Sequence, residues 1–65
     1  MKPYEKTFIH VLCAMKLSED TICGIMAMMD GDKVAMDELV QYVKEHPTAT
    51  EAEVTKAAST IMGIR

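Results

Sequence analysis

The sequence predicts an all-α fold: a compact single domain of four short helices joined by short loops. Apolar residues recur three and four positions apart along most of the 65-residue chain, as in amphipathic helices. No segment shows the strict apolar/polar alternation of a half-buried strand. Capping residues and helix breakers divide the chain into four segments. We expect residues 1–65 to form one helical domain, because a chain of this length has room for one hydrophobic core.

The first two helices are predicted over residues 3–16 and 19–29. Pro3 suits the first position of a helix, since its missing N–H would be unpaired there in any case. Ser18 is the expected N-cap of the second helix. Gly31 follows that helix, at a position where a residue in the left-handed conformation commonly ends one.

The third and fourth helices are predicted over residues 33–45 and 51–62. Asp32 is the expected N-cap of the third helix. Thr50, followed three positions later by Glu53, forms a capping box that begins the fourth helix. The short loops between all four segments require the helices to fold back on or cross one another.

The second predicted helix is apolar on every side, because no polar side chain occurs from Ile22 to Met29. Such a helix requires burial all round. Either the other three helices enclose it, or one face contacts a second copy of the chain. Methionine suits contact surfaces that accept different shapes. We therefore predict a homodimer or larger homo-oligomer that associates through Ile25, Met26, Met28 and Met29.

The charge of the chain indicates which partners to expect. Ten acidic and seven basic residues give a net charge of −3, which disfavours binding to nucleic acid or to anionic membranes. No apolar run approaches the roughly 20 residues that span a bilayer, and the first residues do not resemble a secretory signal. We expect a cytoplasmic protein in which Cys13 and Cys23 are reduced thiols in apolar surroundings.

Four residues are candidate metal ligands, namely His10, Cys13, Cys23 and His46. We expect no metal site and no cofactor, since the chain has neither a CxxC nor an HxxxH spacing. The same residues offer a Cys–His pair, but Cys13 lies near a helix C-terminus, where the dipole opposes a thiolate. Short loops also leave little material for an active site. We therefore expect no catalytic residues, no small-molecule substrate and no enzymatic activity.

Two stretches of the chain resemble known sequence patterns. The Leu-Ser-x-x-x-Ile pattern from Leu17 to Ile22 resembles the entry into the second helix of a helix-turn-helix unit, which implies that residues 33–45 are a DNA-recognition helix. Residues 36–54 look like the first two helices of a winged-helix reader, without the recognition helix. LSEDTICGIM and EHPTATEAEV also resemble short uncharacterised open reading frames of bacterial Firmicutes mobile elements, which implies no activity.

The function we predict is a small protein-interaction or regulatory accessory module that associates with itself through the second helix. The alternative is a helix-turn-helix DNA-binding regulator. Its recognition helix would present Asp37, Glu38 and Gln41 beside Lys33 and Lys44. Such a surface would repel phosphates, so the interaction module is the preferred interpretation.

Overall fold

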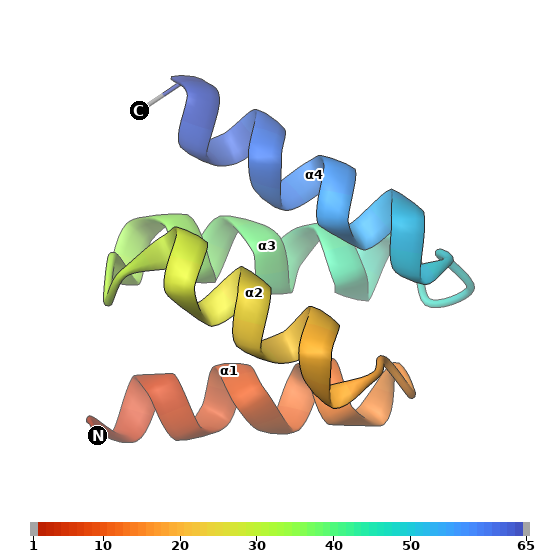
Figure 1. Cartoon of the computed structure of the whole chain (residues 1–65), viewed down its shortest axis with the longest axis horizontal. Coiled ribbons are helices and arrows are strands. Elements are labelled where there is room, and N and C mark those ends of the chain that lie inside the picture. The colour runs from red at the N-terminus through yellow and green to blue at the C-terminus, as the bar shows by residue number, and fades with distance from the viewer. Residues whose placement is uncertain (1, 65) are drawn as a thin grey trace.

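Four α-helices run through residues 2–64, the part of the chain that the computed structural model describes (Figure 1). They are α1 (Pro3–Ala14), α2 (Glu19–Met29), α3 (Lys33–Glu45) and α4 (Glu51–Ile64). No strand occurs among these residues, so the predicted all-α class and the four helices are confirmed. The predicted limits agree with the structure for α2 and α3. Helix α4 continues two residues beyond its predicted end.

Helix α1 ends two residues before its predicted end at Lys16, and the backbone gives the reason. Lys16 has a φ of 62°, in the left-handed region, where an α-helix of L-residues cannot continue. Its amide donates a hydrogen bond to the carbonyl of Cys13 at 2.9 Å, which closes the last turn. Met15 and Lys16 therefore belong to the turn that leads into α2.

The predicted N-caps are confirmed. The Ser18 hydroxyl accepts a hydrogen bond from the Thr21 amide at 3.2 Å, and the Asp32 carboxylate accepts one from the Ala35 amide at 3.1 Å. At the start of α4, the Thr50 amide donates to Glu53 at 2.8 Å. The Glu53 amide donates in return to the Thr50 hydroxyl at 3.2 Å. Amides that would otherwise lack partners at three helix starts are thus satisfied locally.

The turn between α2 and α3 contains two left-handed residues, Asp30 with a φ of 47° and Gly31 with a φ of 76°. Gly31 adopts this conformation without the steric cost that a side chain would add. Its carbonyl accepts a hydrogen bond from the Tyr4 hydroxyl at 2.7 Å. The N-terminal turn of α1 is therefore tied directly to the α2–α3 turn.

The helices pack in a ring that does not follow their order in the sequence. Both α1 and α4 pack against α2 and α3. Helices α1 and α3 run in one direction, while α2 and α4 run back across them (Figure 1). All four helices contribute inward side chains to one core, which consists of Phe8, Leu12, Ile22, Ile25, Met29, Ala35, Met36, Leu39, Val43, Val54 and Ala58.

The described chain forms a nearly isometric body of 26 × 24 × 21 Å. Its radius of gyration of 10.4 Å is close to the value of about 11 Å expected for a folded single domain of this length. One chain therefore closes its own core. None of the four described helices is long and apolar enough to cross a membrane.

One long-range contact joins the starts of α2 and α4. The Glu51 carboxylate accepts a hydrogen bond from the Ser18 amide at 2.8 Å and one from the Ser18 hydroxyl at 3.5 Å. The Ser18 amide is the largest cause of a lowered Glu51 pKa, and the Thr21 and Ser18 hydroxyls lower it further. Glu51, at the first position of α4, thus also stabilises the entry into α2.

The pH dependence of stability tests this contact. Because the folded-state pKa of Glu51 lies below its ordinary value of 4.5, its contribution is present above that pH and is lost as the pH falls through the folded pKa. Glu51→Gln should therefore lower the free energy of unfolding at about pH 7 and lower it by less at an acidic pH, once the wild-type carboxyl has taken up its proton. Urea unfolding followed by circular dichroism measures the free energy of unfolding of both proteins at each pH. An equal loss at the two pH values would contradict a role for the charge.

Candidate functional site

Helix α2 buries one side only. Ile22, Ile25 and Met29 point into the core, whereas Cys23, Gly24 and Ala27 are exposed. This helix is therefore not enclosed by the other three, which was one of the two interpretations of its sequence. Within the apolar run from Ile22 to Met29, the exposed side consists of small residues, so this part of the helix reaches the surface without fully exposing a large side chain.

The four residues predicted to form an interface lie in two different environments. Ile25 and Met29 are 1% and 0% exposed, respectively, and belong to the core. Met26 and Met28 are half-buried on opposite flanks of the helix. A side chain buried in the core cannot contact another protein while the domain stays folded. Of the four, Met26 and Met28 are thus the two that can take part in a contact surface.

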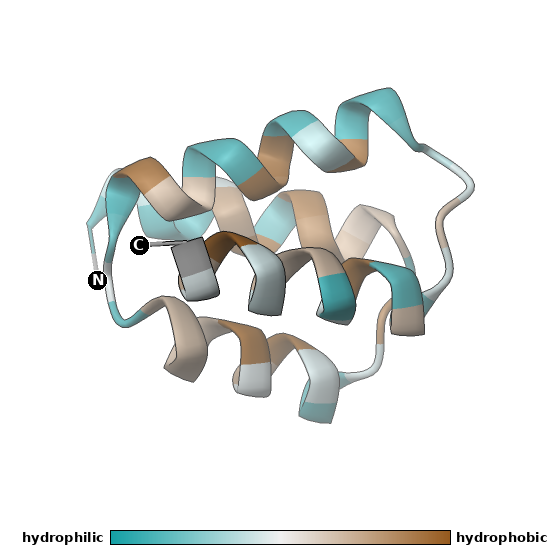
Figure 2. Ribbon diagram, turned by 90° about the horizontal axis from the view of Figure 1, so that it is seen from above, coloured by the Kyte–Doolittle hydropathy of each residue, from teal (hydrophilic) through white to brown (hydrophobic). Residues whose placement is uncertain are grey.

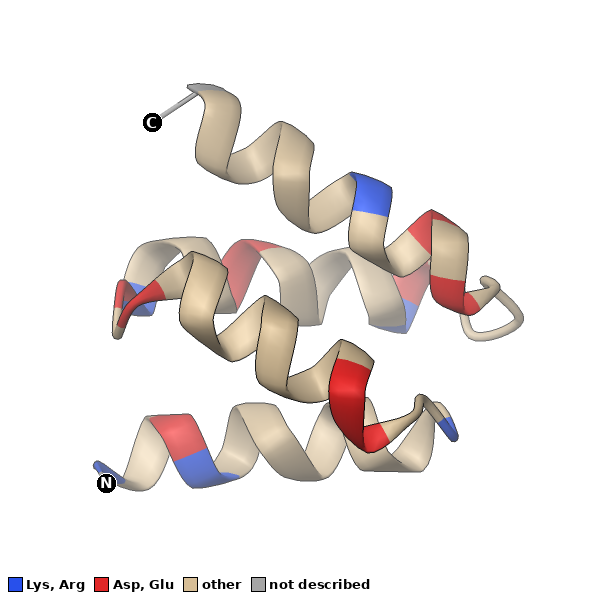
Figure 3. Ribbon diagram, viewed as in Figure 1, with Lys and Arg blue, Asp and Glu red and all other residues tan. Residues whose placement is uncertain are grey.

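An uncharged surface extends from α2 onto α4. The two helices pack together, and their C-terminal halves carry no charged residue among those described, whereas acidic residues gather at their starts (Figure 3). The Ser59 hydroxyl on α4 donates to the Met28 sulfur on α2 at 3.8 Å. We define the uncharged face by residues from both helices: Gly24, Ala27, Met28, Ser59 and Met62. Small residues allow a second helix to approach closely, and methionine adapts its shape to it.

The cysteines are placed differently from the prediction. Cys13 and Cys23 are both free thiols, and both are exposed rather than held in apolar surroundings. Each follows an inward residue, Leu12 or Ile22, and the helical rotation of about 100° per residue turns it away from the core. The exposure of the cysteines could not be predicted from their residue type or their apolar neighbours. In α2, the apolar run does not indicate which side of the helix faces inward.

The candidate metal ligands are not brought together. Within residues 2–64, no three or more His, Cys, Asp or Glu side chains are grouped so that they could hold a metal ion. His10 is exposed on α1. His46 closes α3, where its Nδ1 hydrogen-bonds to the Tyr42 carbonyl at 2.9 Å and its ring stacks on Tyr42 with centroids 4.4 Å apart. His46 is therefore engaged at the end of α3.

The outward side of α3 bears on the DNA-binding alternative. It is largely hydrophilic (the topmost helix in Figure 2) and exposes Asp37, Glu38 and Glu45 beside Lys33 and Lys44. Lys33 is paired with Asp37 at 2.8 Å, and that contact raises the Lys33 pKa. A surface on which carboxylates outnumber the lysines, and one lysine is already paired, provides little attraction for phosphates.

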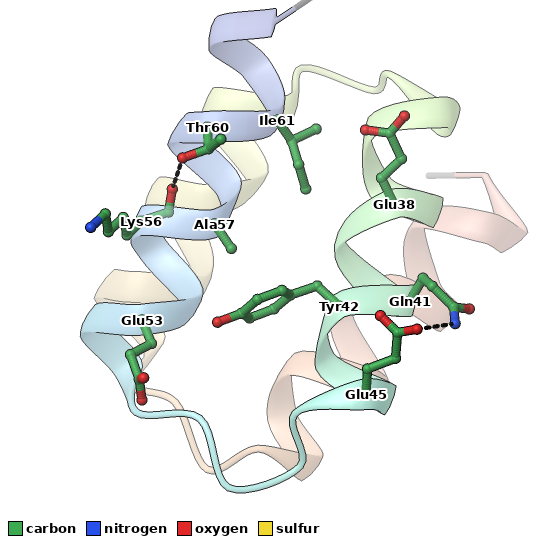
Figure 4. Close-up of a pocket in the computed structure, with 9 residues that line it drawn as sticks. All are labelled: Glu38, Gln41, Tyr42, Glu45, Glu53, Lys56, Ala57, Thr60 and Ile61. Carbon is green, nitrogen blue, oxygen red and sulfur yellow. Dashed lines mark hydrogen bonds between the residues drawn. The ribbon is translucent and has the colours of Figure 1, made fainter.

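A groove of about 550 Å³ lies between α3 and α4 (Figure 4). Three half-buried side chains supply its apolar part: Tyr42, Ala57 and Ile61. Polar and charged side chains line the rest, with Glu38, Gln41 and Glu45 from α3 and Glu53, Lys56 and Thr60 from α4. We call this surface the acidic groove, because among these described residues three carboxylates accompany one lysine.

The fold favours the ionised form of one carboxyl group of the acidic groove, that of Glu53. The Thr50 amide is the largest cause of a lowered Glu53 pKa, and the Thr50 side chain and the nearby His46 lower it further. Glu53 therefore remains ionised at neutral pH. This groove was not predicted from the sequence, because its two walls come from different helices. The only local signal was the acidic outward side of the third helix.

Together, the fold and these surfaces define a small all-α four-helix domain with two solvent-accessible candidate contact surfaces, the uncharged face and the acidic groove. Comparison of the chain with protein-family models, with curated proteins and with solved structures finds no match. Any functional interpretation must therefore be made from the two surfaces themselves.

Substitution of Gly24 tests whether the outward side of α2 is free in the single chain. A methyl group added at Gly24 would meet no atom within 4 Å. Gly24→Ala should therefore raise the free energy of unfolding by about 0.5–1 kcal/mol, through helix propensity alone. Ile25→Ala, the inward neighbour, should lower it by about 2–5 kcal/mol. Urea unfolding at concentrations where the chain is monomeric measures both. Destabilisation by Gly24→Ala would mean that this side is packed.

Proposed function

We propose that the chain is a small protein-interaction or regulatory accessory module that associates with itself through the uncharged face. The observation that carries this proposal is the absence of charge across the described C-terminal halves of α2 and α4, in a chain of which 26% of the residues are charged (Figure 3). Solvated surfaces usually carry charged residues, and contact surfaces are depleted of them.

The shape of the face supports association of two identical copies. Gly24 and Ala27 lie on the outermost side of α2, so a second α2 helix can approach its backbone closely. Met28 on α2 and Met62 on α4 are half-buried, which leaves part of each flexible side chain available to fill the contact. In a two-fold dimer the same patch serves both copies, so one self-complementary face is sufficient.

The DNA-binding alternative gains no comparable support. The recognition helix that it requires is α3, whose outward side is acidic and whose Lys33 is already paired. For such a protein to bind DNA, other contacts would have to outweigh the repulsion between the acidic side of α3 and the phosphates. The interaction module requires no such compensation.

Ala27→Glu tests the proposal with little effect on the fold, because Ala27 is exposed on an existing helix. Met28→Lys is less specific, since Met28 also contacts Ser59 within the chain. In the Ala27→Glu variant, two introduced carboxylates, one from each copy, would face each other in the contact. They should raise the dimer dissociation constant at least about a hundredfold. Thr7→Glu introduces the same charge on the exposed side of α1 and should leave the constant unchanged. Light scattering behind size exclusion, over a wide range of protein concentration, measures the constant for each.

The two exposed thiols supply an independent reporter in the wild type. Cys23 borders Gly24 and lies one turn before Ala27, whereas Cys13 lies on α1. Association through the uncharged face should slow alkylation of Cys23 by iodoacetamide as protein concentration rises and leave Cys13 unaffected. A wild-type chain that stays monomeric throughout, or a dimer that Ala27→Glu does not weaken, would refute self-association through this face.

A further inference from the structure

The acidic groove lies on the other flank of α4 from the uncharged face, and we propose that it binds a basic amphipathic helix of another protein. The two surfaces share α4 but none of their defining residues, since Ser59 and Met62 belong to one and Ala57 and Ile61 to the other. Binding in the groove is therefore independent of self-association.

The apolar part of the groove suits the side chains of a helix. The Tyr42 ring extends from α3 towards α4, and Ala57 and Ile61 face the same space (Figure 4). The volume of about 550 Å³ falls within the range of roughly 300–1,000 Å³ that binding pockets occupy. The groove runs between two helices and is open to solvent, so it admits successive turns of an apolar helix face.

The carboxylates along α3 match the repeat of a helix lying beside it. Glu38 and Glu45 both line the groove and are seven residues apart, which is about two helical turns or roughly 10 Å along the axis. Gln41 lies between them and donates a hydrogen bond to Glu45 at 3.3 Å, which orients the Glu45 carboxylate. Positive side chains at positions i and i+7 of a partner helix would face both carboxylates at once.

Charge complementarity identifies the partner as basic. Glu53 on the α4 side remains anionic, and the Lys56 side chain extends away from α3 in the view of Figure 4. Arginine suits the site best, because its planar guanidinium can pair with a carboxylate through two hydrogen bonds. A nucleic acid would be repelled by the same carboxylates, and a small organic cation would use only one of them.

Two synthetic helical peptides of identical composition test this inference. The matched peptide carries arginines at positions i and i+7 on one flank of a leucine face. The control peptide carries them at i and i+5, which places the second arginine on a different side of its helix. Fluorescence anisotropy of the labelled peptides, titrated with the full chain at low ionic strength, gives the dissociation constants. We expect the matched peptide to bind at least about tenfold more tightly than the control.

Paired substitutions on the protein separate the groove from net charge. The double variant Glu38→Gln, Glu45→Gln should weaken binding of the matched peptide about tenfold. The double variant Glu19→Gln, Asp20→Asn removes two charges at the exposed start of α2 and should change the affinity less than about twofold. Failure of the matched peptide to bind below about 1 mM, equal binding of both peptides, or equal losses for the two double variants would overturn the proposal. So would binding of free arginine as tight as that of the peptide.

The same measurements on Ala27→Glu distinguish this inference from the proposed self-association. Because Ala27 lies outside the groove, this variant should bind the matched peptide as the wild type does. Loss of peptide binding together with loss of the dimer would mean that the groove depends on the dimer, contrary to the independent site proposed here.

Discussion

The structure depends on one constraint: four short helices must close a single hydrophobic core between them. Among residues 2–64, no helix has more than fourteen residues, and each contributes inward side chains to the same cluster. A small domain buries a limited share of its surface, so its stability rests on completing that core. The ring of contacts, in which α1 and α4 each pack on α2 and α3, satisfies this requirement within one chain.

The same closure decides what remains on the surface. Once α2 has turned Ile22, Ile25 and Met29 inward, its small residues must face outward, and the uncharged face results. Once α3 and α4 lie side by side, their outward carboxylates flank a partly apolar groove. Helix α4 forms one edge of both surfaces. The surfaces for the two proposed contacts are thus consequences of how the core is completed.

Local features of this fold could be predicted from the sequence, because the relevant interactions span three or four residues. The caps at Ser18 and Asp32 and the Thr50–Glu53 box are of this kind, and they placed the helix starts correctly. The end of α1 was missed because nothing in the side chain of Lys16 indicates a left-handed backbone.

Features that depend on the packing of distant segments could not be predicted. The Glu51–Ser18 contact joins residues 33 positions apart, and the acidic groove has walls on two helices. The exposure of Cys23 depends on which side of α2 faces inward, and an all-apolar run gives no periodicity from which to read that side. For the same reason, the sequence did not show that Ile25 and Met29 are the side chains of α2 that lie in the core.

The most direct test of this account is whether the fold survives as a monomer. Far-ultraviolet circular dichroism over about a hundredfold dilution, combined with light scattering at each concentration, measures helix content against oligomeric state. We expect the helical signal and a cooperative thermal transition to persist where scattering finds monomers, because one chain closes its own core. Loss of helix in step with dissociation would contradict it, since the core would then require a second chain.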